Sequence, residues 1–421
     1  MGKGRRWYQL RDGNRRIGVT ELKDSLDTKI KKIVERSSKD PHCEFTWLMP
    51  WFSVDNLKEC FKELDGNKAL GVDGKSKDEY SQNLTENLEL LVARMKAMSY
   101  KPQPVKEVLI PKSTGGFRPL GINAFEDKII QNLMAKILGA IYEPTFLDYS
   151  YGFRPGRNCH QAVKTVTDAI FYQRSPVIYE IDFRNFFGSI EHRKLIALLE
   201  MRIKDKIFLR YVSRLLKAGI MSEGTLRTNE VGTVQGSGVS PILANIFAHY
   251  ALDIWFQETV LPRMTGSETT MARYCDDAVF IFSNENDANR FAVALNGRVA
   301  RFCLELHPDK TKLIVWDKNQ RRKGIKPGGF SFLGFTFYLG LSKKGHPIPK
   351  VKSDAARMRK KLKEIGTWIR TQRHKFPPEV IWKQLFSRLS GYAAYYCISH
   401  NLSNVISFMR LCKRLFFKWM N

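Results

Sequence analysis

Two acidic sites in the 421-residue sequence carry side chains that could do chemistry. Asp276 and Asp277 stand next to each other in 271-MARYCDDAVFIFS-283, between apolar runs typical of buried strands. Asp182 follows another apolar run and precedes an aromatic turn in 178-IYEIDFRNFFGSIEH-192. A charge is costly in a protein core unless another group pairs with it. Both sites therefore need a partner of opposite charge.

A divalent cation is the partner that these carboxylates predict. Asp182 and Asp276 each close a hydrophobic strand, so two strands of one sheet can bring them together. Mg²⁺ binds one or two carboxylates together with substrate phosphates, and Mn²⁺ is the alternative. Two such ions can activate a 3′-hydroxyl and stabilise departing pyrophosphate. The competing interpretation is a hairpin turn at Asp276–Asp277 and a helix cap at Asp182, because Asp is common at turns.

The surrounding segments predict a mixed α/β (α+β) protein with a helical end. Residues 1–62 form a basic N-terminal extension, and in 63–340 short β-rich runs alternate with helical segments. Residues 341–421 contain three amphipathic helical patterns. The last helix carries basic residues opposite its apolar stripe, which indicates either a solvated face or a nucleic-acid clamp: Arg410, Lys413 and Arg414.

The composition favours a polyanionic partner. The sequence has 69 Lys and Arg against 42 Asp and Glu, a formal net charge of +27. Lys and Arg neutralise phosphates with release of counterions, although a generally cationic protein is the alternative. No apolar run approaches the roughly 20 residues that span a bilayer. The seven scattered cysteines show no CxxC spacing, so we expect a cytoplasmic protein with reduced thiols and no membrane contact.

A family resemblance is carried by motifs that follow one another along the chain. YCDD at 274–277 and EIDFRNFF at 180–187 resemble the metal-binding motifs of reverse transcriptases, and 233-TVQGSGVSPILANIF-247 resembles the start of their palm helix. Five further segments resemble motifs of the group II intron lineage: 69-ALGVDGKSKDEY-80, 108-VLIPKSTGGFRPLGI-122, 151-YGFRPGRNCHQAV-163, 305-ELHPDKTKLI-314 and 331-SFLGFTF-337. The resemblance implies a right-hand polymerase fold with fingers, a ferredoxin-like palm and a three-helix thumb.

The resemblance also implies roles at the reacting centre. Asp182 and Asp276 would be the main metal ligands, Asp277 would tune or assist the metal, and the carbonyl of Phe183 would complete one coordination shell. Lys310 would donate a proton to departing pyrophosphate, or would simply be a surface lysine. The incoming deoxynucleoside triphosphate would meet four residues: Lys112, Arg118, Phe187 and Gln235.

Other matched residues would contact nucleic acid. Phe187 would lie under the ribose and exclude a 2′-hydroxyl, or it would be a simple core residue. Arg154 would contact the template backbone or cap a loop. The remaining nucleic-acid contacts would come from residues around the motifs and from the primer-binding turn: Arg157, Tyr274, Phe332, Leu333 and Gly334.

The subclass is indicated by departures from the common motifs. YCDD stands in place of YADD, and Val234 stands where the family usually has Pro. The sequence also leaves no room for DNA-binding and endonuclease domains after the helical end. In these features the chain resembles the defence-associated reverse transcriptases of class 2. That resemblance implies a non-coding RNA from the same locus, copied into repetitive cDNA against phage. The alternatives are a compact group II intron-encoded reverse transcriptase and maturase, a non-enzymatic RNA-binding scaffold, or a terminal transferase.

Overall fold

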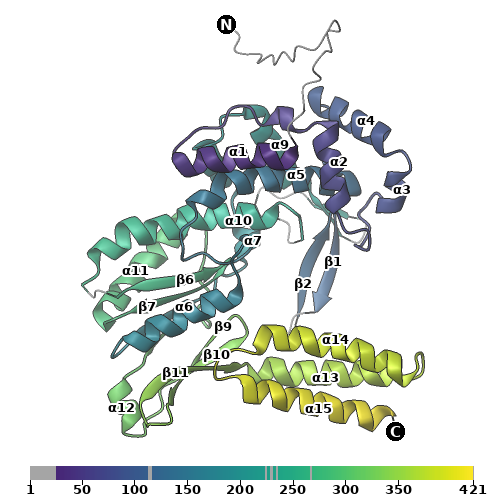
Figure 1. The fold of residues 1–421 in the computed structure, drawn as a ribbon. Coiled ribbons are helices and arrows are strands. Elements are labelled where there is room, and N and C mark those ends of the chain that lie inside the picture. Colours follow the sequence, from purple (N-terminus) through teal and green to yellow (C-terminus); the bar gives the residue numbers. More distant parts are fainter. Residues whose placement is uncertain are drawn as a thin grey trace, which may run out of the picture.

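A computed structural model describes residues 25–111, 116–222, 225–227, 231–233, 236–265 and 268–420. Helices fill one end of the molecule, a sheet flanked by helices forms the middle, and three long helices form the other end (Figure 1). The predicted α/β class is confirmed, and the arrangement fits a right-hand polymerase with a sheet as its palm. Within the described parts of the chain, no helix combines the length and apolar character needed to cross a bilayer. All seven cysteines are free thiols.

The palm sheet is buried on both faces. It consists of four strands in the order β6-β7-β3-β8: β3 (Val177–Ile181), β6 (Thr270–Tyr274), β7 (Asp277–Phe282) and β8 (Lys312–Val315). Successive side chains of a strand point to opposite faces. Tyr179 and Phe280 therefore pack toward α11 (Glu285–Arg301), whereas Ile178 and Val279 pack toward α6 (Cys159–Tyr172). Burial on both faces explains why apolar residues predominate in these strands without a regular alternation with polar ones.

A long hairpin projects from the helical end toward the three long helices (Figure 1). Its strands β1 (Val105–Pro111) and β2 (Phe117–Ile122) pair antiparallel, with Ile110 opposite Arg118. We call it the fingers hairpin. It belongs to a four-stranded sheet that also contains β4 (Ile220–Ser222) and β5 (Thr225–Arg227).

The helical end is built around the helix α5 (Phe125–Tyr142), most of whose residues are buried. Around it lie α1 (Leu26–Lys39), α2 (Val54–Glu63), α3 (Lys77–Ser81), α4 (Leu84–Lys96), α8 (His192–Glu200) and α9 (Lys206–Leu216). Shorter helical segments connect the larger elements: η1 (Met49–Trp51), η2 (Glu143–Thr145), α7 (Phe186–Ser189), α10 (Ser240–Ala248), η3 (His249–Asp253), η4 (Phe256–Val260), η5 (Leu261–Arg263) and α12 (Lys318–Arg322).

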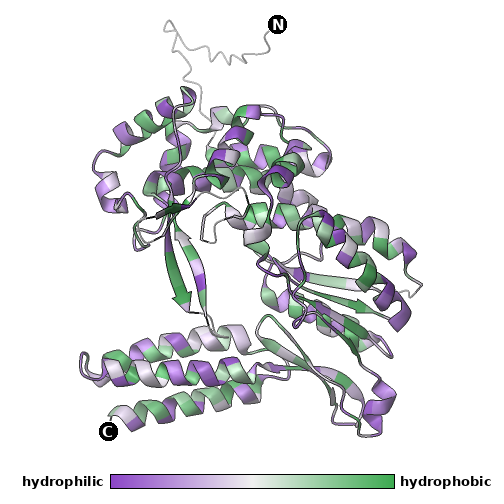
Figure 2. Cartoon of the chain, turned by 180° about the vertical axis from the view of Figure 1, so that it is seen from behind, coloured by the Kyte–Doolittle hydropathy of each residue, from purple (hydrophilic) through white to green (hydrophobic). Residues whose placement is uncertain are grey.

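A second small sheet leads into the three long helices. It has the order β11-β10-β9, with β9 (Phe330–Phe332), β10 (Phe335–Leu341) and β11 (Pro347–Ser353). The helices that follow, which we call the thumb helices, are α13 (Ala355–Gln372), α14 (Pro378–Tyr396) and α15 (Leu402–Met420). Hydrophobic and hydrophilic residues alternate around them (Figure 2), and their apolar sides form a separate core cluster that includes Ile369, Leu385 and Phe408.

Phe291 of α11 is the centre of the aromatic packing under the palm sheet. Its ring lies 4.5 Å from Phe280 and 5.1 Å from Phe282, between ring centroids. Phe291→Ala should lower the free energy of unfolding by about 3–5 kcal/mol, because it leaves a cavity that rigid neighbours cannot fill. Denaturant unfolding measures this. Val293→Ala on the same helix is the control, since Val293 is 76% exposed and its loss should change stability by less than about 0.5 kcal/mol.

Candidate active site

The register of the palm sheet brings the acidic residues to one end. Ile181 of β3 lies opposite Ala278 of β7 in an antiparallel pair. The next position outward therefore places Asp182 opposite Asp277, and adjacent strands lie about 4.8 Å apart. Asp276 belongs to the turn that connects β6 to β7 at the same end. Two segments far apart in the sequence thus bring three acidic residues to one end of the sheet, close enough for the charges of Asp182 and Asp276 to act on Asp277.

The turn that carries Asp276 has a constrained backbone. Tyr274 pairs with Asp277, so only Cys275 and Asp276 connect the two strands. Cys275 has φ +60°. A type II′ turn requires a positive φ at its first central residue, and residues other than glycine rarely adopt one. A neighbouring loop approaches this turn at Gly152, where an added Cβ would lie 2.6 Å from the Cys275 nitrogen. The turn is therefore packed too closely to move freely.

Burial and mutual repulsion weaken the acidity of these carboxylic acids. The pKa of Asp277 is raised to about 7, mainly by burial and in addition by the charges of Asp276 and Asp182. Burial also raises the pKa of Asp276, with Asp182 adding to the effect. The pKa of Glu180 is about 7, chiefly because of burial. Such a group of carboxylates would be stabilised by a cation.

The donor set fits a cation that shares its coordination with a substrate. Within the part of the chain that the structure describes, no group of three or more His, Cys, Asp or Glu side chains is arranged to hold a metal by itself. Mg²⁺ commonly binds one or two carboxylates and completes its shell with water and phosphate oxygens. Asp182 and Asp276 would hold it here. Phe183 directly follows Asp182 and forms a bridge with Leu306, which fixes the backbone at this position.

Lys310 contacts the acidic group directly. Its Nζ donates to an Asp182 carboxylate oxygen at 2.9 Å, and its side chain is about half exposed. The backbone nitrogen of His307 also donates to the carbonyl of Asp182 at 2.7 Å, which ties the 305–314 segment to the end of β3. The structure thus places Lys310 beside the carboxylates, where an ammonium can meet an anionic substrate.

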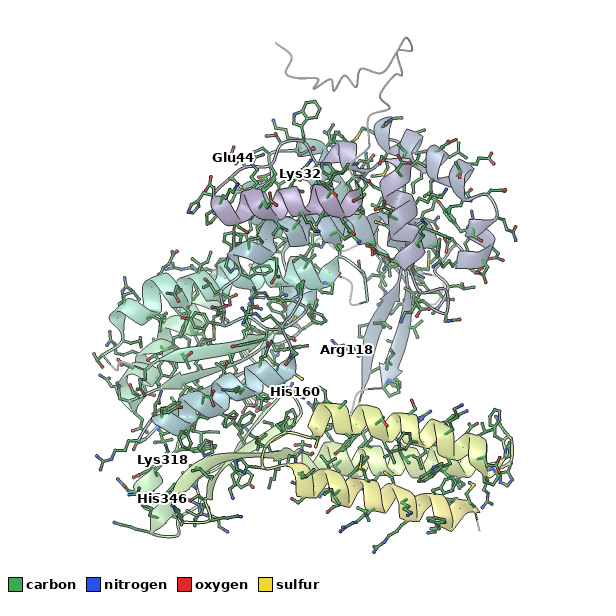
Figure 3. All side chains as sticks on the ribbon, in the orientation of Figure 1. Lys32, Glu44, Arg118, His160, Lys318 and His346 are labelled. Atoms are coloured by element: carbon green, nitrogen blue, oxygen red, sulfur yellow. The ribbon has the colours of Figure 1, made fainter. Side chains whose placement is uncertain are left out.

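Two of the predicted nucleotide-binding residues can be located. Arg118 lies on the fingers hairpin above the space between palm and thumb helices (Figure 3), and its charge lowers the pKa of Asp276. Phe187 is 7% exposed and packs edge-to-face on Phe186, with 5.8 Å between ring centroids. Lys112 and Gln235 lie outside the described residues.

Arg154 is buried inside its own loop. Its Nε donates to Glu143 at 2.9 Å, and its Nη1 donates to the carbonyls of Leu147 and Ser150 at 2.8 Å each. These contacts correspond to the loop-capping alternative, because they occupy the donors that a template phosphate would need. Arg157 is partly exposed and pairs with Asp148.

A pair of aromatic side chains, Tyr274 and Phe153, lies beside the acidic turn. Tyr274 is partly buried, and its ring centroid is 6.3 Å from that of Phe153, which is largely exposed. The two rings offer an accessible apolar surface close to Asp276, of the kind on which nucleic-acid bases stack.

The predicted primer-binding turn is held by the thumb helices. Leu333 and Gly334 have φ +51° and +78°, as a type I′ turn requires, and they connect the buried Phe332 to β10. The hydroxyl of Tyr395 donates to the Leu333 carbonyl at 2.9 Å. At the same helix end, His160 Nε2 of α6 lies 2.7 Å from the Tyr395 carbonyl (His160 is labelled in Figure 3).

Arg357 is a site residue that the sequence analysis missed. A Cβ added at Gly334 would lie 2.9 Å from Arg357 Nη1 and 3.0 Å from the hydroxyl of Tyr396. The Arg357 charge also lowers the pKa of Asp277. In the sequence, Arg357 is recognisable only as a basic residue at the start of a helical pattern. The packing of α13 against the 333–334 turn brings the Arg357 guanidinium near the carboxylates.

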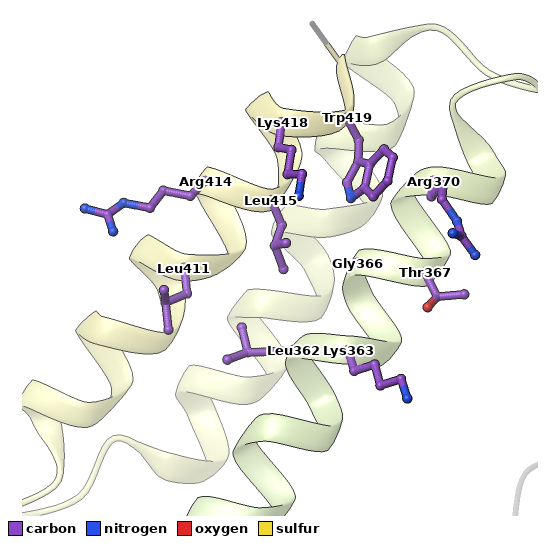
Figure 4. A pocket seen from close by; sticks show the side chains of 10 residues that line it. All are labelled: Leu362, Lys363, Gly366, Thr367, Arg370, Leu411, Arg414, Leu415, Lys418 and Trp419. Carbon is purple, nitrogen blue, oxygen red and sulfur yellow. The ribbon is translucent and has the colours of Figure 1, made fainter.

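The basic residues of α15 lie on the surface of the thumb helices. Arg410, Lys413 and Arg414 are exposed. Arg414 lines a groove of about 590 Å³ between α13 and α15 (Figure 4). The groove has an apolar floor and cationic edges, and none of its lining residues is acidic: Leu362, Lys363, Gly366, Thr367, Arg370, Leu411, Arg414, Leu415, Lys418 and Trp419.

Comparison with known proteins decides the family. The model of the reverse transcriptase (RNA-dependent DNA polymerase) family matches residues 110–337, which is more than half of the chain. The chain belongs to the reverse transcriptase family. The matched range contains both acidic motifs, Lys310 and the turn at 333–334, whereas the α15 cations lie beyond it.

Several relatives of this reverse transcriptase chain come from introns. The group II intron-encoded protein LtrA of Lactococcus lactis subsp. cremoris is 37% identical over 190 residues, 45% of this chain and 31% of that protein. An uncharacterized 91 kDa protein in a cob intron of Schizosaccharomyces pombe is 37% identical over 189 residues, 45% of this chain and 23% of that protein. Protein YkfC of Escherichia coli K12 is 37% identical over 185 residues, 43% of this chain and 48% of that protein. The chain thus spans less than half the length of each.

Asp277→Asn should reduce the pH dependence of stability in metal-free reverse transcriptase. The pKa of Asp277 rises from 3.8 to about 7 on folding, so the folded state holds this proton more tightly than the unfolded chain. Stability should therefore fall as the pH rises from about 4 to about 7, and the wild type should lose more than the variant. Melting temperatures measured with a chelator across this range test the prediction. Parallel curves for the two proteins would contradict it.

Proposed function

We propose that the protein copies RNA into DNA by joining deoxynucleotides to a primer 3′-hydroxyl at the Asp182–Asp276–Asp277 group. The observation that carries the proposal is the convergence of these three acids at one end of the palm sheet, within the range that matches the reverse transcriptase family. Bound Mg²⁺ would neutralise the phosphates and activate the attacking hydroxyl. The carboxylates of Asp182 and Asp276 would orient that cation, and Asp277 would adjust its affinity through the shared negative charge.

Cations from different parts of the chain would bind the triphosphate. Arg118 on the fingers hairpin lowers the pKa of Asp276, and Lys310 donates a hydrogen bond to Asp182. Arg118 precedes the three acidic residues in the sequence, and Lys310 follows them. Guanidinium and ammonium groups bind phosphate oxygens through charge-assisted hydrogen bonds. Lys310 would stabilise, and then protonate, the departing pyrophosphate. We assign the same type of role to Lys112, and a role toward the sugar or base to Gln235.

Primer and template would lie along the palm and the thumb helices. The 333–334 turn would hold the primer end, because its backbone is fixed by Tyr395 and lies next to Arg357. Arg157 and the ring of Tyr274 would contact the template near the acidic turn. The exposed cations of α15 would bind the backbone of the duplex that leaves the site, since such contacts are independent of sequence.

For the source of the template, two structured RNAs fit the chain. The intron-encoded relatives favour a group II intron RNA, with the protein also assisting splicing. The YCDD and VQGSGVSP segments favour a dedicated non-coding RNA that is copied repeatedly for anti-phage defence. Sequencing the nucleic acid that co-purifies with the protein distinguishes them. Intron sequence supports the first, and one structured RNA with repetitive complementary DNA supports the second.

Asp276→Ala combined with Asp277→Ala should reduce RNA-templated DNA synthesis by at least about 10³-fold, because the charge that stabilises the transferring phosphates is removed. RNA binding should stay within about threefold of wild type, since phosphate contacts by Lys and Arg dominate affinity. Primer extension and filter binding measure the two quantities. Asp168→Ala, an exposed aspartate on α6, is the control and should keep full activity. DNA synthesis by the double variant would refute the assignment.

Phe187→Ala should increase incorporation of ribonucleotides relative to deoxynucleotides by about 10- to 200-fold, the range that a steric pocket discriminates. The matched control is Phe186→Ala, because Phe186 is also buried and packs edge-to-face on the ring of Phe187. Competitive incorporation of the two nucleotide types gives the ratio. A ratio that is unchanged, or that changes equally in both variants, would exclude a specific role for Phe187 in sugar selection.

A further inference from the structure

Arg273 is a fully buried cation directly before the acidic turn. It is the fourth residue of β6, and its side chain has no exposed surface. A guanidinium has five N–H donors, and here each has an acceptor. Nε donates to Asp253 at 2.7 Å, Nη2 donates to Asp253 at 2.5 Å and to Ser150 Oγ at 2.8 Å, and Nη1 donates to Asn245 Oδ1 at 3.1 Å and to the Cys275 carbonyl at 2.9 Å.

These bonds join three separate parts of the chain. Asn245 and Asp253 belong to α10 and η3, and Ser150 belongs to the loop that approaches the acidic turn. The same loop is also held by Asn245, whose Nδ2 donates to the Gly152 carbonyl at 2.7 Å. Arg273 contributes backbone bonds as well, to Tyr149 at 2.8 Å and from Tyr151 at 2.9 Å.

The segment that supplies Asp253 has an unusual helix geometry. Residues His249–Asp253 form a π-helical turn, a rare form that is frequent at functional sites. Asp253 is completely buried, and the Arg273 charge lowers its pKa against the opposing effect of burial. The pair is thus ionised although it has no contact with water.

Stability alone does not account for such a pair. A buried ion pair is often no more stabilising than well-packed apolar side chains of the same size. The pair instead fixes the orientation of the backbone next to it. The Cys275 carbonyl belongs to the peptide group that carries the nitrogen of Asp276, and Cys275 is held at φ +60°. A hydrogen bond of 2.9 Å to this carbonyl therefore sets the orientation of the peptide plane from which the Asp276 side chain extends.

We propose that Arg273, held by Asp253, is a positioning residue that fixes the Cys275–Asp276 peptide and thereby fixes the direction of the Asp276 carboxylate, so that it faces the position where it would hold a cation together with Asp182. The proposal rests on the polymerase function proposed above and deepens it. Arg273 touches no substrate, and it acts through the turn. A displacement of about 1 Å in a catalytic group can cost about 100-fold in rate.

Arg273→Lys tests the proposal, with Arg202→Lys as a matched control. Lysine keeps the charge but lacks the planar fork that reaches several acceptors at once. Arg202 is 4% exposed and donates to the Ile141 carbonyl at 2.6 Å and to Ser37 Oγ at 3.0 Å, far along the chain from the acidic turn. Both variants should melt at lower temperature than wild type. Only Arg273→Lys should lower kcat for primer extension, by about 10- to 100-fold, with the KM for deoxynucleotides within about threefold.

Hydrogen exchange of the metal-free, full-length protein supplies a readout that is independent of activity. In Arg273→Lys, amides in peptides covering 270–282 should exchange at least about tenfold faster than in wild type, and in Arg202→Lys they should not. Asp253→Asn keeps the size of the side chain and removes the charge that holds Arg273. This variant is the test to use if Arg273→Lys fails to fold. It should change kcat and exchange in the same direction as Arg273→Lys, to a smaller degree.

The outcomes separate this proposal from the proposed function. If wild-type protein makes DNA and the double aspartate variant does not, but Arg273→Lys retains wild-type kcat and exchange in 270–282, the positioning role is refuted while the polymerase assignment stands. An equal loss of kcat in Arg273→Lys and Arg202→Lys would also refute it, because a general loss of stability would then be the cause. If wild-type protein makes no DNA, the polymerase assignment fails, and the exchange measurement still tests the hold on the turn.

Discussion

The antiparallel pairing of β3 with β7 is the interaction on which the rest of the structure depends. This register alone places Asp182 opposite Asp277, and a slip by one residue would turn the side chains of β3 to the other face of the sheet. The register is held because both faces of the sheet are buried, with α11 on one side and α6 on the other. The apolar packing around Phe291 thus opposes the repulsion between carboxylates at the end of the strands.

Positive charges from three regions converge on these carboxylates. Arg118 comes from the fingers hairpin, Lys310 from the segment before β8, and Arg357 from the first thumb helix. Each lowers the electrostatic cost of gathering acids together, and each comes from a different structural part. A substrate that carries phosphates would meet carboxylates and cations within one site, so the excess of basic residues in the composition has a local consequence as well as a general one.

Two tight hairpins next to the site have backbone conformations that their residues do not favour. Cys275 and Leu333 both have positive φ, although neither is glycine. The first turn is held by the guanidinium of Arg273, which lies in the strand that leads into it, and the second by the hydroxyl of Tyr395 from α14. Strained conformations persist only where the surrounding structure holds them, and they are common at functional sites. The close approach of Gly152 to the first turn has the same effect.

The sequence by itself determined the α/β class, the acidic motifs at the ends of apolar strands and the family, because strand patterns and motif residues are local properties. Only the tertiary structure decided which other side chains reach the site. Arg154 points into its own loop and caps it. Arg357 reaches the primer-binding turn from a helix some 80 residues beyond Asp276. Arg273 donates to five acceptors in three segments. The burial and the partners of a long side chain depend on segments that are remote in sequence, and no local pattern records them.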